Sequence, residues 1–436
     1  MANKLKVGII GAGVTGMSAA WDLVNAGHDV TVYEAGSEVG GLASGFRDEN
    51  WDWSLEKFYH HWFETDEDIK KILTEMGQWG QVIFPRPKTS YWIDGDVVRS
   101  EISPSAIFLP ISLPATARMG FAGIYLKMLS NGIQLEKHTA HDWLTRYMGT
   151  EAYDKFFRPL LIGKFGGQYQ DVNMAWMWAR VKARSLHLGI YQGGFQAFLD
   201  ALGEAITQKK ASINLDSPVD RLHIVDNKPV LTVKGEETVF DRVISTTSPQ
   251  RLLKMADGLS ETPYGEKVDN LNSIGAVCVI YAMKQSVLTD GTYWLNLPAD
   301  SPDKTKSQFP FLALVEHTNW LPKEHYGGDH IIYAGDYVPV DHEYFQMSDD
   351  ELAERFLQVM PTFNPDFKPE WVRKSWVFRA PYAQPVPKVN HSQNIPALQT
   401  PLSGVYWASM SQVYPWDRGT NFAVEIGRQV AELAMS

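Results

Sequence analysis

Three glycine residues near the start of the chain have the spacing of a loop that binds phosphate groups. Gly11, Gly13 and Gly16 follow the apolar run at residues 7–10 and precede a stretch whose apolar residues recur with helical spacing. Gly11 would permit a tight turn, and Gly13 would let the backbone approach a pyrophosphate. Gly16 would let the helix lie close to the strand before it. We therefore expect a strand, a turn and a helix that together bind a phosphate-containing ligand.

The residues between these glycines would lie at the N-terminus of the expected helix. Ala12, Val14 and Thr15 are expected to contribute to the same site, because unpaired N–H groups and the helix dipole favour an anion there. A second apolar run ends in Glu34 and Ala35, about twenty residues after the turn, where a carboxylate would meet ribose hydroxyls. This order of parts is typical of a dinucleotide site. The alternative is a βαβ unit that binds no ligand.

A second glycine pair narrows the choice of cofactor. Gly40 and Gly41, followed by Leu42, stand just beyond the second expected strand. A glycine turn, a helix, a strand, an acidic residue and then such a pair resemble the FAD-binding start of the amine oxidase and protoporphyrinogen oxidase superfamily. Phytoene desaturases and, more distantly, UDP-galactopyranose mutases belong to it. The resemblance implies non-covalently bound FAD in an extended form.

Composition and charge limit the classes of protein and partner. The chain has 436 residues, enough for two domains, and 44% hydrophobic with 21% charged residues is ordinary for a soluble globular protein. A net charge of −11 without a basic run argues against nucleic acid as a partner. The single cysteine, Cys278, lies in an apolar run and can form no internal disulfide. Because no signal peptide is recognisable, we expect a cytoplasmic protein that acts on a small molecule.

Two adjacent histidines are the first candidates for proton transfer. His60 and His61 stand in a segment, residues 58–66, that passes beside the flavin ring in the resembling superfamily. The segment is similar to one of UDP-galactopyranose mutases, with His61 at the position of a flavin-side histidine. The alternative is a pair of packed or surface histidines without a catalytic role.

Basic residues in the helical part of the chain are candidates for substrate binding. Residues 85–191 read as proline-punctuated helices with many aromatics, and the stretch 153–167 resembles the superfamily's substrate domain. Lys155, Arg158 and Lys164 in this stretch would suit an anionic substrate. The alternative, which the sequence alone favours, is that they are solvated helix charges.

The most hydrophobic part of the chain lies at residues 104–130. Pro110, Pro114 and Arg118 interrupt it, so it is not expected to form a transmembrane helix. Two roles fit its composition, an apolar cap over a pocket and a patch that contacts a membrane. We favour the cap.

Two further segments of the chain are expected to contact the cofactor. Gly193 and Gly194 precede an amphipathic helical pattern at residues 195–209, and short alternating strands follow it. The resemblance places a valine backbone against the adenine, and Val219 takes that position. The strand that ends near Thr247 is similar to the superfamily's return toward the flavin edge.

The C-terminal segment carries the second strong signal. A strand at residues 405–408, a loop and a helix from Thr420 resemble the superfamily's closing FAD motif, in which the helix N-terminus points at the flavin. The backbone N–H groups of Thr420 and Asn421, with the Arg418 guanidinium, would stabilise negative charge on reduced flavin. An exposed ion pair at a helix start is the alternative for Arg418. Tyr414 is a third candidate for acid–base chemistry.

Two features depart from the superfamily pattern. Ser409, Met410 and Ser411 stand where an acidic residue usually contacts the cofactor. Ser411 or Gln412 would have to substitute for it. Ala276 stands where amine oxidases proper carry a lysine that holds a water against the flavin, which favours a desaturase-like or other dehydrogenase.

We therefore predict a two-domain α/β flavoprotein. A Rossmann-like FAD-binding domain would comprise residues 1–84, 192–250 and 396–436, and an α+β substrate domain residues 85–191 and 251–395. The function that fits best is an FAD-dependent oxidoreductase that takes a hydride from a hydrophobic or aromatic substrate at flavin N5. The alternatives are a flavin-dependent sugar-nucleotide mutase and a flavin-binding protein without catalysis. No metal site is expected, and the oligomeric state is left open.

Overall fold

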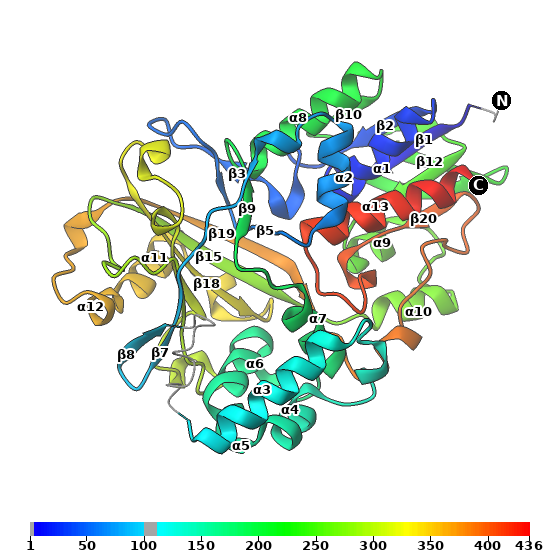
Figure 1. The fold of residues 1–436 in the computed structure, drawn as a ribbon. Coiled ribbons are helices and arrows are strands. Elements are labelled where there is room, and N and C mark those ends of the chain that lie inside the picture. The colour runs from blue at the N-terminus through cyan, green and yellow to red at the C-terminus, as the bar shows by residue number, and fades with distance from the viewer. Residues whose placement is uncertain (1–3, 100–110) are drawn as a thin grey trace.

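A parallel sheet brings the two ends and the middle of the chain together. The computed structural model describes residues 4–99 and 111–436, and its architecture is mixed α/β (Figure 1). Hydrogen bonding places the strands of this sheet in the order β10–β2–β1–β14–β20. They are β1 Lys6–Ile10, β2 Asp29–Tyr33, β10 Ser212–Asn214, β14 Arg242–Ser245 and β20 Val405–Trp407.

The first long helix and the last one pack against each other beside this sheet. α1 (Val14–Asn25) follows the turn after β1, and α13 (Thr420–Met435) ends the chain. A Cβ on Gly427 of α13 would lie 2.4 Å from the carbonyl oxygen of Thr15, so only glycine allows this approach. The contact fixes the C-terminal helix beside the start of α1.

The middle segment adds a helix and a small antiparallel sheet to the same part of the molecule. α8 (Phe195–Gln208) buries its apolar face in the core that it shares with α1. The small sheet has the order β11–β12–β13. Its strands are β11 Val219–Val225, β12 Lys228–Val233 and β13 Glu236–Val239.

A seven-stranded sheet dominates the other part of the molecule. Its order is β19–β15–β18–β17–β16–β7–β8. The strands are β7 Thr89–Ile93, β8 Asp96–Arg99, β15 Ser273–Met283, β16 Trp294–Asn296, β17 Ala313–Glu316, β18 His330–Val338 and β19 Val372–Pro385. β15 is buried along nearly its whole length, as expected for a strand covered on both faces, and it contains the buried Cys278. α11 (Asp349–Leu357) and α12 (Met360–Phe363) accompany this sheet.

A group of helices forms a third packed region below the sheets (Figure 1). The helices are α3 Leu113–Met128, α4 Ala140–Met148, α5 Thr150–Ala152, a π-helical turn Tyr153–Phe157, α6 Arg158–Phe165 and α7 Met174–Ala183. Large buried aromatic side chains, among them Phe165, Trp176 and Trp178, fill the core between them. These helices and the sheets above them confirm the predicted fold class.

Short elements connect these regions. The helices are α2 Glu67–Glu75, α9 Pro249–Met255 and α10 Pro263–Asp269. The strands are β3 Gly45–Phe46, β4 Leu55–Glu56, β5 Trp62–Phe63, β6 Val82–Ile83 and β9 Leu188–Tyr191.

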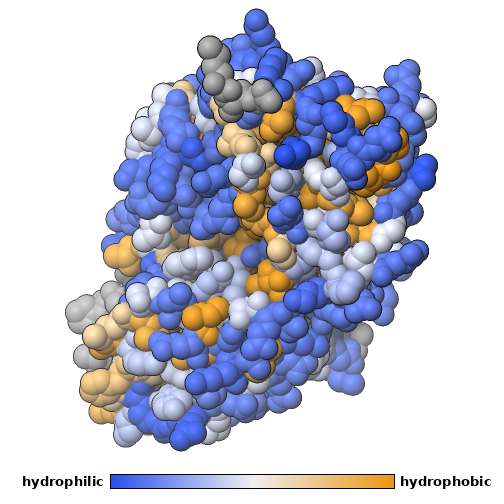
Figure 2. All heavy atoms as spheres, turned by 90° about the vertical axis from the view of Figure 1, so that its right-hand side faces the viewer, coloured by the Kyte–Doolittle hydropathy of each residue, from blue (hydrophilic) through white to orange (hydrophobic). Residues whose placement is uncertain are grey.

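Residues 104–110 of the apolar stretch 104–130 lie outside the described residues. The described remainder, residues 111–130, contains the helix α3. α3 points several apolar side chains outward, and Phe121 and Met128 are 76% and 79% exposed. No residue of α3 lines the cofactor cavity described below, so the expected cap over a pocket stays a prediction. Every helix in the described ranges is too short or too polar to cross a bilayer. The face that carries both chain termini is by contrast mostly hydrophilic, with apolar residues in separate patches (Figure 2).

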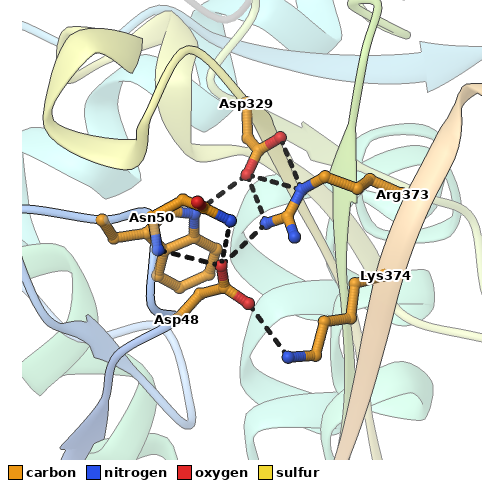
Figure 3. Close-up of polar contacts among 6 residues, drawn as sticks. Asp48, Asn50, Asp329, Arg373 and Lys374 are labelled. Atoms are coloured by element: carbon orange, nitrogen blue, oxygen red, sulfur yellow. Dashed lines mark hydrogen bonds and ion pairs between the residues drawn. The ribbon is translucent and has the colours of Figure 1, made fainter.

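A polar cluster joins the loop after the second glycine pair to the seven-stranded sheet (Figure 3). Arg373 of β19 donates to Asp329 at 2.6 Å and to Asp48 at 3.2 Å. Lys374 and Asn50 donate to the Asp48 carboxylate as well. Burial alone would raise the pKa of Asp48, but these bonds hold it below its ordinary value. The cluster therefore fixes this loop to the sheet with both buried carboxylates satisfied.

Candidate functional site

A cavity of about 460 Å³ lies where the turns of the parallel sheet meet the start of α13. Its wall includes most of the residues predicted to hold a cofactor. These are Gly11, Gly13, Val14, Thr15, Glu34, Ala35, Gly40, Gly41, Leu42, Val219, Thr247, Arg418 and Thr420. His60 also lines the cavity, whereas Ala12, Gly16, His61, Tyr414 and Asn421 are not among the residues of its wall.

The glycine turn has the close approaches that its spacing predicted. Gly11 has a φ of +103°, and a Cβ there would lie 2.5 Å from the Thr246 hydroxyl oxygen. A Cβ on Gly16 would lie 2.0 Å from the carbonyl oxygen of Gly11, so the helix rests directly on the turn. At Gly13 a Cβ would meet only Gly40 and Gly41 atoms at 4.0 Å, which leaves the backbone open toward the cavity.

Glu34 is fixed at the edge of the cavity by backbone donors. Its carboxylate accepts the N–H of Ala12 at 2.7 Å and the N–H of Gly36 at 2.8 Å. Ala12 thus contributes by orienting the acidic side chain, although it does not line the cavity. A carboxylate held by two backbone N–H groups still has oxygen lone pairs that can accept bonds from ribose hydroxyls.

The second glycine pair lies directly beside the first turn. Gly40 donates its N–H to the Ala12 carbonyl at 2.8 Å, and Gly40 and Gly13 form an isolated parallel bridge. Gly40 and Gly41 both have positive φ values, 123° and 58°. The pair therefore closes one side of the cavity with backbone alone.

The middle segment contributes the opposite side. Val219 and Thr247 line the cavity as predicted, and the Val219 carbonyl accepts a hydrogen bond from Arg251 at 2.6 Å. Arg251 and Pro218 also line it, although they were not predicted from the sequence. Neither belongs to a glycine motif, so only their position beside Val219 and α9 could have indicated them.

The two residues predicted at the start of α13, Thr420 and Asn421, make different contacts. Thr420 lines the cavity, and its hydroxyl accepts a hydrogen bond from the Trp62 indole at 2.8 Å. The Asn421 side chain turns away and accepts the N–H groups of Asp68 and Ile69 at 2.9 and 3.1 Å. Asn421 thus caps α2, a role that only the tertiary structure reveals.

Arg418 lines the cavity and is held by side chains of the seven-stranded sheet. Its Nε donates to the Gln384 side chain at 3.1 Å, and its terminal nitrogen donates to the Tyr337 hydroxyl. Within the described residues it forms no ion pair with a carboxylate. The exposed ion pair considered for Arg418 is therefore wrong.

Hydroxyl groups stand where the superfamily pattern would have placed an acid. Ser409 and Met410 line the cavity together with Tyr382, whose hydroxyl lies 3.2 Å from Ser409 Oγ and 2.6 Å from Ser411 Oγ. Gln412 instead accepts the N–H of Ser409 at 2.8 Å and so stabilises its own turn. Tyr382 comes from the long strand β19, and no local motif identified it.

His60 is the predicted acid–base residue that reaches the cavity. Its Nδ1 lies 2.6 Å from the Phe58 carbonyl oxygen, which can only accept, so Nδ1 carries the proton and Nε2 remains an acceptor. Burial and the nearby Arg418 guanidinium lower the pKa of His60 to about 4. The imidazole is therefore neutral at physiological pH.

The other two predicted acid–base residues lie elsewhere. Burial and the adjacent His60 lower the pKa of His61 to about 3, and its Nδ1 has no hydrogen-bond partner. The Tyr414 hydroxyl donates to Glu136 at 2.9 Å and accepts from Asn173 at 3.1 Å. Burial and the bond to Glu136 raise the pKa of Tyr414. These partners place Tyr414 in a structural network beside the helical region.

The cavity wall suits an extended dinucleotide. Glycine backbones, helix N-termini and Arg251 offer groups that favour phosphates, Glu34 offers a ribose acceptor, and apolar residues such as Val219 offer surface for a base. At Gly11 and Gly40 the positive φ values and close approaches exclude a side chain, and at Gly13 the space that a side chain would occupy is open to the cavity. The residues present therefore fit the predicted cofactor.

Comparison with known proteins gives the same class of molecule. The pattern of the family described as flavin containing amine oxidoreductase matches residues 14–435. A putative protoporphyrinogen oxidase from Exiguobacterium has a crystal structure with a TM-score of 0.77 and 16% identity, over 100% of this chain and 99% of that one. A reduced UDP-galactopyranose mutase has a TM-score of 0.76 and 18% identity, over 98% of this chain and 95% of that one. At such identities these structures show the fold alone.

Curated relatives match over shorter stretches. A zeta-carotene desaturase of Solanum lycopersicum is 38% identical over 74 residues, which are 17% of this chain and 12% of that protein. The chain thus aligns with only a small part of that relative. The family pattern, however, spans nearly the whole chain, which confirms the predicted resemblance, the FAD cofactor and the oxidoreductase class. The chain belongs to the flavin-containing amine oxidoreductase family.

Proposed function

We propose that this chain binds FAD without a covalent bond and oxidises a small hydrophobic or aromatic substrate. The observation that carries the proposal is the convergence of three distant segments on one cavity: the Gly11 turn, the pair Gly40–Gly41 and the N-terminus of α13. Flavin, when bound, accepts a hydride at N5. We further propose that the FAD-binding domain comprises residues 1–84, 192–250 and 396–436, since all five strands of the parallel sheet come from these ranges.

The residues of the cavity would divide the work of binding between them. The N–H groups of the glycine turn and the positive end of the α1 dipole would hold the phosphates, and Glu34 would hold a ribose. Arg418 and the first turn of α13 would hold the flavin ring and stabilise negative charge on it. This assignment follows from which residues lie on each side of the cavity.

His60 is the residue best placed to handle a proton. Its Nε2 is a neutral acceptor whose orientation is fixed by the bond from Nδ1 to Phe58. It can therefore accept a proton or a hydrogen bond from a group bound in the cavity. His61 would support it from behind, because it does not line the cavity.

A sugar-nucleotide mutase is the second candidate. The resemblance of residues 58–66 to a segment of these mutases favours it, but His60 of this segment lies on the cavity wall, whereas His61, which the resemblance places beside the flavin, does not. A mutase would need reduced flavin for activity yet consume no reductant. A flavin-binding protein without catalysis would retain FAD but show no change of its flavin spectrum with any substrate.

An anaerobic screen tests the proposal. The FAD-loaded protein would be mixed with amines, polyenes, porphyrinogens and nucleotide sugars while the absorbance of the oxidised flavin is recorded. Bleaching by one class of compound supports oxidation of that class. Turnover of a nucleotide sugar only after prior reduction of the flavin would favour the mutase instead.

A further inference from the structure

Positively charged side chains gather on the substrate side of Arg418. Lys164 of α6, Arg180 of α7 and Arg184 just after α7 join Arg418 in what we call the cation cluster. Arg180 lies within electrostatic range of both Lys164 and Arg184, and Lys164 within range of Arg418. Because Arg418 also lines the FAD cavity, the cluster is continuous with the proposed flavin site.

Lys164 is the most unusual member of the cluster. It is only 8% exposed, and its Nζ lies 4.0 Å from the centre of the Tyr337 ring. The two other basic residues considered with it are ordinary surface charges. Lys155 pairs with Asp94 at 2.7 Å, and Arg158 faces Asp154 at 3.7 Å.

The positive charges of the cluster are not balanced by protein carboxylates. Arg180 pairs with Asp417 at 3.1 Å. Lys164, Arg184 and Arg418 form no ion pair with any carboxylate in the described part of the chain. The buried Asp336 nearby is already paired with Lys304 at 2.8 Å. The four basic side chains of the cluster therefore have one carboxylate partner between them, Asp417.

Lys164 is nearly buried, and a buried positive charge is costly unless a partner supplies the opposite charge. Arg184 is exposed and Arg418 is half-buried and lines the cavity, so a ligand can reach both side chains. Arg418 and Lys164 also converge on Tyr337, one by a hydrogen bond to its hydroxyl and one over its ring. The cluster thus has the positive charge that an anion-binding site needs, and a ligand can reach it.

We propose that the cation cluster binds an anionic group, a carboxylate or a phosphate, that is carried by the substrate. This inference rests on the proposed function, because it places that group next to the flavin site. A free amine is a cation at neutral pH and would be repelled by the cluster. The family is described by amine oxidation, but this chain is built for a substrate of the opposite charge.

The electrostatics of the cluster agree with this assignment. Burial, with Arg418 and Arg180 nearby, lowers the pKa of Lys164 to about 8. Burial alone would raise the pKa of Tyr337, but Arg418 and Lys164 together hold it below its ordinary value. The Tyr337 shift shows that negative charge is favoured at this point, and the smaller contributions of Arg418 and Arg180 to the Lys164 shift agree with it.

A series of ligands with one shape and different charges tests the inference. Benzoate, phenyl phosphate, benzamide and benzylamine would be titrated into the FAD-loaded protein by calorimetry. We expect benzoate or phenyl phosphate to bind about tenfold or more tightly than benzamide, and benzylamine to bind most weakly. Tighter binding of benzoate indicates a carboxylate, and tighter binding of phenyl phosphate indicates a phosphate. Equal affinities, no binding of either anion, or tightest binding of benzylamine would overturn the proposal.

Two lysine variants locate the binding. Lys164→Met should weaken binding of the preferred anion about tenfold and leave benzamide unchanged, whereas Lys155→Met, from the same stretch, should leave both unchanged. An unchanged affinity in Lys164→Met contradicts the assignment. If that variant does not fold, the ligand series on the unaltered chain decides alone. Flavin absorbance is recorded on every sample: a colourless protein contradicts the proposed function, and a yellow protein without anion preference contradicts only this inference.

Discussion

The cofactor end and the substrate end of the proposed site are formed by different kinds of groups. At the cofactor end, glycine backbones and helix N-termini form the wall, and Glu34 is oriented by the N–H groups of Ala12 and Gly36. At the proposed substrate end, the long side chains of Lys164 and Arg180 come from separate helices, α6 and α7. One end favours an anion with backbone dipoles, and the other does so with formal charges.

This difference has consequences for specificity. A wall of backbone groups depends on local chain geometry, so it binds the same cofactor wherever the turn is kept. A cluster of side chains can change its ligand with a single substitution, because each cation contributes separately. Arg418 belongs to both ends, since it lines the cavity and donates to Tyr337. Four predictions test this comparison, in order of decreasing effect.

The largest effect is expected at the glycine turn. Gly13→Glu would place a charged side chain in the space that the phosphates need and should abolish FAD retention. The readout is the flavin absorbance of the purified protein. Gly80→Glu is the control, because Gly80 is exposed and a Cβ there meets no atom within 4 Å. A Gly13→Glu protein that purifies as yellow as this control would contradict the phosphate assignment.

The second effect is a pH dependence at the substrate end. The pKa of Lys164 is lowered to about 8, so this side chain is charged below that pH and neutral above it. Affinity for the preferred anion should therefore be full near pH 7 and fall about tenfold by pH 9.5. In Lys164→Arg the decline should be smaller, because arginine stays charged and only the ionisation of Tyr337, whose pKa is lowered, would still oppose the anion. Calorimetric titrations of both proteins across this range check the prediction, and parallel declines would argue against Lys164.

The third effect concerns the residue shared by both ends. Arg418→Ala should lower the two-electron potential of the bound flavin, because a positive charge that stabilises the reduced form is lost. A loss of about 1.4 kcal/mol corresponds to about 30 mV. Arg418→Lys should recover part of the shift. A redox titration in which all three proteins agree would remove Arg418 from this role.

The smallest effect is on folding stability. His61 has a pKa of about 3 in the folded protein and an ordinary value when unfolded, so the unfolded chain binds more protons between these values. Stability should therefore be nearly complete above pH 6.5 and should decline by about 1 kcal/mol between pH 6.5 and 5.5 because of this residue. His61→Gln should reduce the decline, and His138→Gln, on the exposed surface, should not. Urea unfolding at several pH values measures it.

The cofactor end could be predicted from the sequence because its determinants are local. Gly11, Gly13 and Gly16 need only a strand before them and a helix after them, and Glu34 needs only the next strand. The same applies to the C-terminal helix, whose start at Thr420 was predicted and is found. Backbone sites of this kind are encoded by spacing along the chain.

The substrate end could not be predicted in the same way, because side-chain direction is not encoded by spacing. Lys155 and Lys164 look alike in the sequence, yet one forms a surface ion pair and the other is buried over Tyr337. Asn421 follows Thr420 directly, but its side chain caps α2. Tyr382 reaches the cavity from a long strand that shows no motif.

The most direct test of the account is a titration of the flavin-free protein with FAD, followed by quenching of flavin fluorescence. We predict saturable binding of one FAD per chain, and its loss in Gly13→Glu. A well-folded chain that takes up no FAD, or a Gly13→Glu variant that binds it equally well, would contradict the claim that both chain ends form one cofactor site.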